Sequence, residues 1–302
     1  MLNISEPDIT RYLKLFGISR RKPSYHALRE ILEAQMMNVP FENISKLYYL
    51  KKSGLKGIPD FEQFLSGIER YHFGGTCYSN NYYLHQLLNS LGYNVNLCGA
   101  DMSKPDVHIA NIVKIEDYEY IVDTGYAAPF LEPLPRNLQT DYIISKGVNR
   151  YVLKPMDNNG CSRMELYRNN ELQHGYMLKP QPRSIEEFKE VIEESFNAEV
   201  TFMNAILLAR YSHDRSYIFH NLNYTEILAD TIKTYTTKTS EELIRLINIV
   251  FGIPENILDT VLIDQPLIHG AWNGIKSPFQ PSLVATTSVS DQMLVEIESN
   301  LC

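Results

Sequence analysis

The spacing of apolar residues changes from a helical period to a strand period near residue 92, and this change limits the chain to a fold that mixes helices and strands. Before that point, apolar residues recur three and four positions apart, as on one face of a helix. After it, the segments 107–115 and 118–123 are rich in β-branched and aromatic residues, which favour strands. The expected helices are one capped by Ser5 that contains Ile9, Tyr12, Leu13 and Phe16, one from near Ser24 that ends before Pro40, and one from about Cys77 to Gly92.

Two further zones follow the helical one. Prolines break about 93–180 into short pieces, as in a small barrel or a curled sheet. The last zone has both kinds of pattern. Its expected elements are a helix opened by the capping box Ser184-Ile-Glu-Glu187 and running to about Phe196, strands at 201–210 and 215–220, and a helix capped by Thr239 that ends before Gly252.

Composition and charge exclude several classes of protein. With 44% hydrophobic and 21% charged residues, the chain is composed like a folded globular protein. A net charge of −8 without a long run of Lys or Arg is unfavourable for binding nucleic acid or an anionic membrane surface. The N-terminus lacks the pattern of a signal peptide, and the most apolar stretch, 205–209, is far too short to span a membrane. A cytoplasmic location is therefore expected.

One of the four cysteines stands in a setting that favours chemistry. Cys77, Cys98, Cys161 and Cys302 form no C-x-x-C pair, which indicates free thiols in a reducing compartment. Gly74 and Gly75 allow a sharp turn just before Cys77, and an amphipathic helix follows it. The unpaired N–H groups and the positive dipole end at a helix N-terminus favour a thiolate, which is the nucleophilic form of cysteine. The alternative is a buried cysteine that only packs as a small apolar residue.

A nucleophilic cysteine needs a base, and His108 with Asp123 fits that need. If 107–115 and 118–123 pair through a two-residue turn, His108 lies opposite or diagonal to Asp123 and on the same face of the hairpin. Asp123 can then accept a hydrogen bond from one imidazole nitrogen while the other faces the thiol. The alternatives are a surface histidine and an aspartate that merely starts a turn, and His72 and His85 remain candidates for the base.

These residues resemble the motifs of the arylamine N-acetyltransferase family. The chain has four of them in the family's order: Pro40-Phe41-Glu42-Asn43, Gly74-Gly75-Thr76-Cys77-Tyr78, Val107-His108, and Val122-Asp123-Thr124-Gly125. Weaker likeness follows at 201–210 and 241–253, so that the resemblance covers about residues 5–260. It implies an α+β multidomain fold with a cysteine-protease-like core. The implied parts are an N-terminal helical bundle (1–91), a central β-barrel (92–183), an inter-domain helix (184–200) and a C-terminal α/β lid (201–302).

The resemblance also implies roles for particular residues. Cys77 would be the nucleophile that takes an acetyl group from acetyl-CoA, His108 the general base, and Asp123 the group that orients it. An arylamine or hydrazine would then attack the acetyl-enzyme, and no metal is implied. Phe41, Tyr126 and Phe202 match positions that line the family's acceptor pocket, against the alternative of plain core packing. Gly125 is the one residue proposed to contact CoA.

Three positions depart from the family pattern. Most members have Arg where this chain has Phe73 and Glu where it has Ser79, and they carry another glycine after Gly125, in the stretch Tyr126-Ala-Ala-Pro-Phe130. The missing Arg normally pairs with the Glu of the Pro-Phe-Glu-Asn segment. Glu42 is therefore expected either to pair with Arg70 or to face solvent, because a buried carboxylate without a partner would cost several kcal/mol or take up a proton.

Two other functions remain open at this point. A cysteine amidase or transglutaminase-like hydrolase uses the same Cys-His-Asp logic, although the Phe41 segment and the C-terminal lid argue against it. A relative that binds acyl-CoA without turning it over is the non-enzymatic alternative, which the presence of Cys77, His108 and Asp123 opposes. The sequence does not indicate an oligomeric state.

Overall fold

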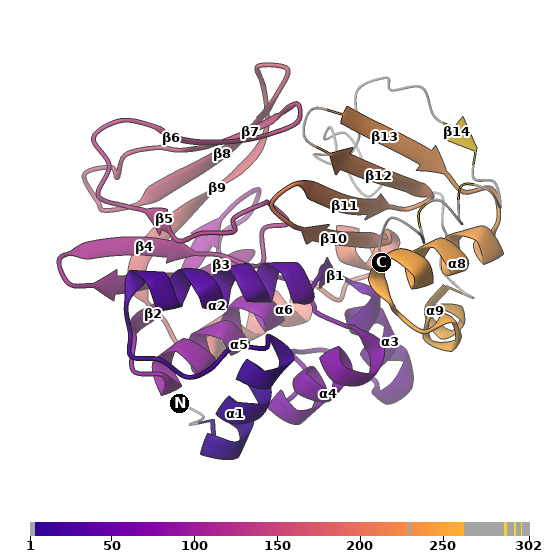
Figure 1. The fold of residues 1–302 in the computed structure, drawn as a ribbon, viewed down its shortest axis with the longest axis horizontal. Helices are drawn as coiled ribbons and strands as arrows, with labels where there is room; N and C mark the ends of the chain where they lie inside the picture. Colours follow the sequence, from indigo (N-terminus) through magenta and orange to yellow (C-terminus); the bar gives the residue numbers. More distant parts are fainter. Residues whose placement is uncertain (1–3, 229–230, 263–286, 289–292, 294–296, 298–302) are drawn as a thin grey trace.

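The computed structural model describes residues 4–228, 231–262, 287–288, 293 and 297, and its helices and strands follow in the order that the periodicity predicts (Figure 1). The helices are α1 (Glu6–Leu15), α2 (Tyr25–Asn38), α3 (Ile44–Ser53), α4 (Phe61–Tyr71), α5 (Cys77–Ser90), α6 (Lys189–Glu194), α7 (Thr201–Asn204), α8 (Ser240–Phe251) and α9 (Glu255–Leu262), with a 3₁₀ turn, η1 (Ile185–Phe188). No helix in these ranges is both long enough and apolar enough to cross a membrane.

The predicted helices near the N-terminus are confirmed. Ser5 caps α1 by accepting a hydrogen bond from the N–H of Asp8, and Ser24 caps α2 by accepting one from Ala27. The helix α2 ends before Pro40 because a residue that precedes proline disfavours the α region. The sequence analysis missed α3, α4 and α9. A capping box formed by Asp60 and Gln63 begins α4 and was a signal that could have revealed it.

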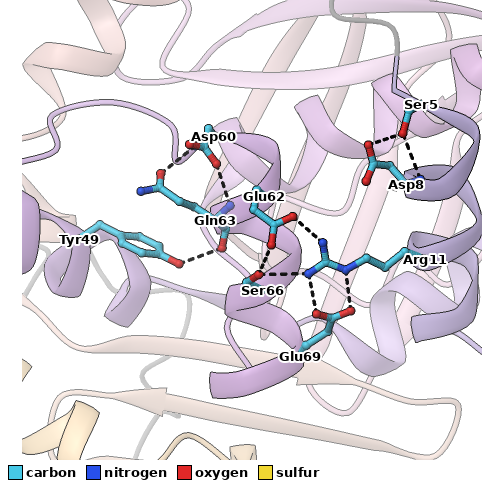
Figure 2. A network of polar contacts seen from close by, with 9 residues as sticks. All are labelled: Ser5, Asp8, Arg11, Tyr49, Asp60, Glu62, Gln63, Ser66 and Glu69. Atoms are coloured by element: carbon cyan, nitrogen blue, oxygen red, sulfur yellow. Dashed lines mark hydrogen bonds and ion pairs between the residues drawn. The ribbon is translucent and has the colours of Figure 1, made fainter.

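Arg11 fastens α1 to α4 (Figure 2). Its guanidinium lies 2.6 Å from a carboxylate oxygen of Glu69 and 2.5 Å from one of Glu62, and it also donates to Ser66. Glu62 and Glu69 are on the outside of α4, where water and salt screen such pairs, so they contribute little to stability. The main effect of this network is to fix the position of α1 relative to α4, and both helices support α5.

The strands form two sheets that lie side by side in Figure 1. The eight-stranded, antiparallel one curls into a nearly closed barrel, with the strand order β5-β4-β3-β2-β9-β8-β7-β6. Its strands are β2 (Asn94–Asp101), β3 (His108–Ile115), β4 (Tyr118–Val122), β5 (Leu134–Pro135), β6 (Tyr142–Lys146), β7 (Asn149–Leu153), β8 (Ser162–Arg168) and β9 (Glu171–Pro182). The helix α5 packs against β2 and β3, which brings its N-terminus to one end of the barrel.

The six-stranded sheet combines a strand from the N-terminal part of the chain with strands from its C-terminal part. Its strand order is β1-β10-β11-β12-β13-β14, and a short strand from the N-terminal part, β1, pairs with β10. Its strands are β1 (Phe41–Glu42), β10 (Leu207–Tyr211), β11 (Arg215–His220), β12 (Asn223–Leu228), β13 (Thr231–Thr236) and β14 (Thr287–Ser288). Apolar residues of α3, α8 and α9 share one core with this sheet, so the Pro-Phe-Glu-Asn segment is held from both sides.

The hairpin of β3 and β4 has the predicted register. Asn111 lies opposite Val122, and the two-residue connection falls at Glu116 and Asp117. Continued by one step, this register sets Asp123 opposite Ala110, two residues from His108 and therefore on the same face as His108.

Two expectations about the last zone are wrong in detail. The strand expected at 201–210 begins only at Leu207, because the buried amide of Asn43 donates to the carbonyls of Phe202 and Ala205 and accepts from the N–H of Leu207. These three hydrogen bonds stabilise a turn before Leu207, so residues 201–204 form the short helix α7 instead of a strand. The helix expected from the Ser184 capping box exists, but it begins as η1 and ends at Glu194.

Other expectations about this zone are confirmed or stay open. The strand at 215–220 and the helix capped by Thr239 are present, and that helix ends in a left-handed Gly252. The domain boundaries drawn from the resemblance stay a prediction.

Candidate functional site

Cys77 is the first residue of α5, and the turn before it is fixed by close backbone packing. A Cβ on Gly74 would lie 1.8 Å from the carbonyl oxygen of Pro40, and Gly75 has a φ of +145°, so neither position accepts a side chain without movement. The side chain of Thr76, the N-cap residue, makes no hydrogen bond to the first turn of α5. N–H groups of that turn are therefore available to a negatively charged atom beside Cys77.

His108 and Asp123 form a fully buried hydrogen-bonded pair. Nε2 of His108 lies 2.8 Å from Oδ2 of Asp123, and the other carboxylate oxygen accepts from the Asn81 amide and the Gly125 N–H, each at 2.9 Å. Because Nε2 is occupied, Nδ1 is the nitrogen left for the Cys77 thiol, which is close enough to His108 to raise the pKa of the imidazole. Sγ of Cys77 lies 3.9 Å from the carbonyl oxygen of Val107, directly before His108.

The charges of this pair support one another. Burial alone would lower the pKa of His108, but the charge of Asp123, its hydrogen bond and the neighbouring Cys77 raise the pKa to about 10. Burial opposes ionisation of Asp123 as well, yet His108, Asn81 and the Gly125 N–H keep the pKa of this carboxyl below its usual value. At neutral pH the pair is therefore an imidazolium and a carboxylate, an arrangement that can stabilise a thiolate and transfer a proton.

Two tyrosines enclose the imidazole of His108. The ring centroid of Tyr176 lies 4.9 Å from that of His108, and the ring of Tyr126 lies edge-on at 5.9 Å. Tyr126 also stacks on His174 and its hydroxyl lies 3.1 Å from Nδ1 of that residue. These rings exclude water from His108 and limit the orientations of its ring.

The side chain of Cys77 lines a cavity of about 400 Å³, a size suited to a small molecule. Phe41, Gly125, Tyr126 and Phe202 line this cavity together with Cys77 and His108, while Asp123 lies behind His108. Phe41 and Phe202 meet edge to face, with their centroids 5.9 Å apart, although they come from β1 and α7. The residues that were predicted from the sequence to form the site therefore lie together at this cavity.

Gly125 has a structural reason to be glycine. A Cβ at this position would lie 2.4 Å from the Cα of Cys77 and 2.7 Å from the Asn81 amide nitrogen. Gly125 thus lets the segment after β4 lie directly against the N-terminus of α5.

Gly125→Ala is expected to push this segment away from Cys77 and to lower the rate of Cys77 acylation by about 100-fold, as displacements of about 1 Å do in other sites. The check is the rate of acyl-enzyme formation beside that of Gly57→Ala, where an added Cβ meets nothing closer than 3.9 Å. Equal rates in the two variants would show that the close approach has no role in the chemistry.

Both expectations for Glu42 are wrong. Its carboxylate is completely buried and accepts hydrogen bonds from the backbone N–H groups of Ser45, at 2.8 Å, and Gly74, at 3.0 Å. Backbone donors at the start of α3 and in the turn before α5 thus replace the missing Arg, and burial raises the pKa of Glu42. Arg70 lies instead beside the carboxylates of Glu62 and Glu69. Phe73 packs among Tyr48, Tyr49 and Tyr71.

Glu42→Ala is expected to lower the free energy of unfolding by about 2–4 kcal/mol, because it leaves two buried N–H groups without acceptors. Urea unfolding measures this loss, and Glu190→Ala on exposed α6 is the control, with a change of about 0.5 kcal/mol or less. A loss no larger than in the control would mean that Glu42 does not hold the turn before Cys77.

Cys98, Cys161, His72 and His85 do not line the cavity. Cys98 is buried in β2, and burial raises the pKa of its thiol to about 12. Cys161 is half-buried, and Cys302 is outside the described residues. His72 ends α4 in the left-handed conformation against Gly252, and His85 is buried in α5. Neither of these histidines lines the cavity.

His174 and Lys46 are among the cavity residues that could not be predicted from the sequence. His174 comes from β9, and burial lowers its pKa to about 4, so it is neutral where it meets Tyr126. Lys46 comes from α3, where the sequence Ile44-Ser45-Lys46-Leu47 is typical of a helix whose polar residues face solvent. No sequence signal distinguishes either residue, because their positions depend on contacts between distant segments.

Ala127, in the stretch after Gly125, takes a φ of +58°. This left-handed conformation costs an alanine about 1 kcal/mol or more. Its carbonyl accepts a hydrogen bond from the hydroxyl of buried Tyr211, which fixes the turn despite the cost. The cavity wall at this point therefore carries a methyl group.

Comparison with known proteins agrees with this geometry. The family model described as N-acetyltransferase matches residues 24–258. The arylamine N-acetyltransferase pineal gland isozyme NAT-3 of Gallus gallus is 28% identical over 60% of this chain and 70% of its own length. The N-malonyltransferase FDB2 of Fusarium pseudograminearum is 32% identical, over 32% of this chain and 33% of its own length.

The fold is also found among solved structures. That of the Mycobacterium marinum arylamine N-acetyltransferase in complex with CoA matches with a TM-score of 0.69 at 18% identity, over 84% of this chain and 97% of that one. The match of the family model to most of the chain, with the same fold in these structures, shows that the chain belongs to the arylamine N-acetyltransferase family.

Proposed function

We propose that this chain transfers an acetyl group from acetyl-CoA to an arylamine or a hydrazine, and that Cys77 carries the acetyl group between the two. The observation that carries the proposal is the 2.8 Å bond from His108 to Asp123 beside Cys77, with Cys77 and His108 on the wall of one cavity. Nucleophile, base and orienting carboxylate thus lie next to one another in the order that such a reaction needs.

In the first half of the reaction, Sγ of Cys77 attacks the carbonyl carbon of acetyl-CoA. The negative charge that develops on the carbonyl oxygen is met by the backbone N–H groups at the start of α5. The bond from that carbon to the CoA sulfur then breaks, and the imidazolium of His108 gives its proton to the departing thiolate. The products are free CoA, an acetyl-cysteine thioester and a neutral His108.

In the second half, the amine nitrogen attacks the thioester carbon. His108 takes one proton from this nitrogen, the carbon–sulfur bond to Cys77 breaks, and the acetylated amine leaves. Asp123 holds the imidazole in the orientation that both halves need and stabilises its charged form. The thiolate and the imidazolium are restored, so the enzyme ends as it began.

Aromatic walls fit the proposed acceptor. Phe41, Tyr126 and Phe202 surround the thiol and give an aromatic amine flat apolar surfaces to pack against. For CoA the support is weaker: the similar M. marinum enzyme is described in complex with CoA, and in this chain Gly125 lines the cavity. We also propose that the enzyme acts in the cytoplasm.

Steady-state kinetics test the proposal against the two alternatives. With acetyl-CoA and an arylamine, the enzyme should form the acetylated amine, and reciprocal plots at several amine concentrations should be parallel, as a two-step transfer requires. Hydrolysis of peptide amides without amine acetylation would favour the amidase. Binding of acetyl-CoA without any product would favour a non-catalytic relative.

A further inference from the structure

Lys46 is a charged residue in an unusual position, on the wall of the cavity that Cys77 opens onto. It lies on α3, one turn after the Pro-Phe-Glu-Asn segment, and it is close enough to Cys77 for the two groups to interact through their charges. The reaction proposed above does not need a lysine here, because His108 already handles the proton.

The surroundings of Lys46 hold its ammonium in place without neutralising it. Nζ donates to the hydroxyl of Ser195 at 2.6 Å and lies 3.8 Å from the centroid of the Phe196 ring. Within the described residues, no carboxylate oxygen lies within 4.0 Å of Nζ, and the two acids on the same cavity wall, Glu194 and Glu199, are exposed to solvent. One of the three N–H donors is therefore used, and two remain for a ligand.

Burial of this ammonium is unfavourable by itself. It lowers the pKa of Lys46 to about 8, so that most molecules still carry the charge at neutral pH. The charge of Cys77 offsets this effect only in part, and a methionine or leucine would fill the same half-buried place without it. A negatively charged substrate group in the cavity would remove the penalty.

We propose that Lys46 binds a carboxylate carried by a substrate, so that the enzyme favours acyl donors or amine acceptors with a free carboxylate close to the reacting atoms. This inference rests on the proposed function. The carboxylate has two sources, the acyl group bound to Cys77 or the incoming amine. The two halves of the reaction separate them, because the donor reacts before the acceptor arrives.

The experiment compares matched substrates in each half. For the donor, the rate constants of acyl-enzyme formation are measured with malonyl-CoA and acetyl-CoA in the absence of amine. For the acceptor, the acetyl-enzyme reacts with 4-aminobenzoate and with the neutral 4-aminobenzamide. The variants are Lys46→Met, which removes the charge, Lys46→Arg, which keeps it, and Lys52→Met on the exposed face of the same helix as control.

Lys46→Met is expected to lower the preference for the charged substrate about tenfold or more in at least one half, which is the size of a charge-assisted hydrogen bond. Lys46→Arg should retain most of the preference, and Lys52→Met all of it. A loss confined to the donor half assigns the carboxylate to the acyl group, and a loss confined to the acceptor half assigns it to the amine. Both results support the proposal.

Three results would overturn it. Unchanged preferences in Lys46→Met would show that Lys46 recognises no carboxylate. Equal losses with both CoA donors, absent with 4-nitrophenyl acetate, would show that Lys46 meets the phosphates of the coenzyme instead. If no donor acylates even the unmodified enzyme, the proposed function fails and this inference fails with it, whereas a normal acetyl-enzyme beside an unaffected Lys46→Met defeats the inference alone.

A measurement on the unmodified enzyme covers the case in which Lys46→Met does not fold. Free malonate should inhibit acylation by acetyl-CoA about tenfold more strongly than its neutral analogue malonamide. Equal inhibition by the two compounds would contradict a carboxylate site.

Discussion

Replacing Cys77 by Ser or Ala is expected to lower amine acetylation by about 10⁴-fold or more and to abolish the acyl-enzyme. The side chain is small and lies at the cavity wall, so neither change removes much packing. A serine hydroxyl in the same place is a far poorer nucleophile, because it gives up its proton much less readily than a thiol. The measurement is the turnover of acetyl-CoA with an arylamine, supported by a urea unfolding curve for each variant.

Cys161→Ser is the matched control for this experiment. Cys161 is half-buried in the turn before β8 and does not line the cavity, so its replacement should leave turnover within about twofold of the unmodified enzyme. If Cys77→Ala kept a tenth or more of the activity, a mechanism without a covalent intermediate would have to replace the one proposed here.

Asp123→Asn is expected to slow acyl-enzyme formation by about 10³- to 10⁴-fold while leaving the chain folded. An asparagine of the same shape can still bond to the Gly125 N–H, but it carries no charge and can present an N–H to His108 in place of an acceptor. The imidazole then loses both its orientation and the charge that stabilises its protonated form. Asp117→Asn, in the exposed turn of the same hairpin, should behave as the unmodified enzyme does.

The same substitution has a consequence for the pH dependence of stability. Because the pKa of His108 is raised from 6.5 to about 10 in the folded chain, the pair stabilises the fold fully below pH 6.5 and loses this effect as the pH rises to about 10. The unmodified enzyme should therefore lose more stability than Asp123→Asn between these pH values. Urea unfolding at several pH values measures the difference, and parallel curves would contradict a charged His108.

The placement of His108 near Asp123 was predictable because strand geometry leaves few choices. A two-residue turn fixes the register of β3 and β4, and the two-residue period of a strand then puts both side chains on one face. The position of Cys77 at a helix N-terminus followed in the same way from local pattern. Such features depend on residues close together in sequence, where the backbone geometry is nearly sufficient.

The rest of the site depends on contacts that no local pattern contains. The Asn43 amide converts 201–204 from an expected strand into α7, and this places Phe202 against Phe41. Glu42 finds backbone donors at Ser45 and Gly74, which a search for an oppositely charged partner does not consider. Lys46 is half-buried because Ser195 and Phe196 lie over it.

Mass spectrometry of the intact enzyme after brief exposure to acetyl-CoA, with no amine present, shows whether Cys77 carries the acetyl group. We expect the mass to rise by one acetyl group, peptide mapping to find this group on Cys77, and an added arylamine to remove it as its acetylated product. An enzyme that stays unmodified while it acetylates amines, or that carries the group on another residue, would rule out the acetyl-cysteine intermediate.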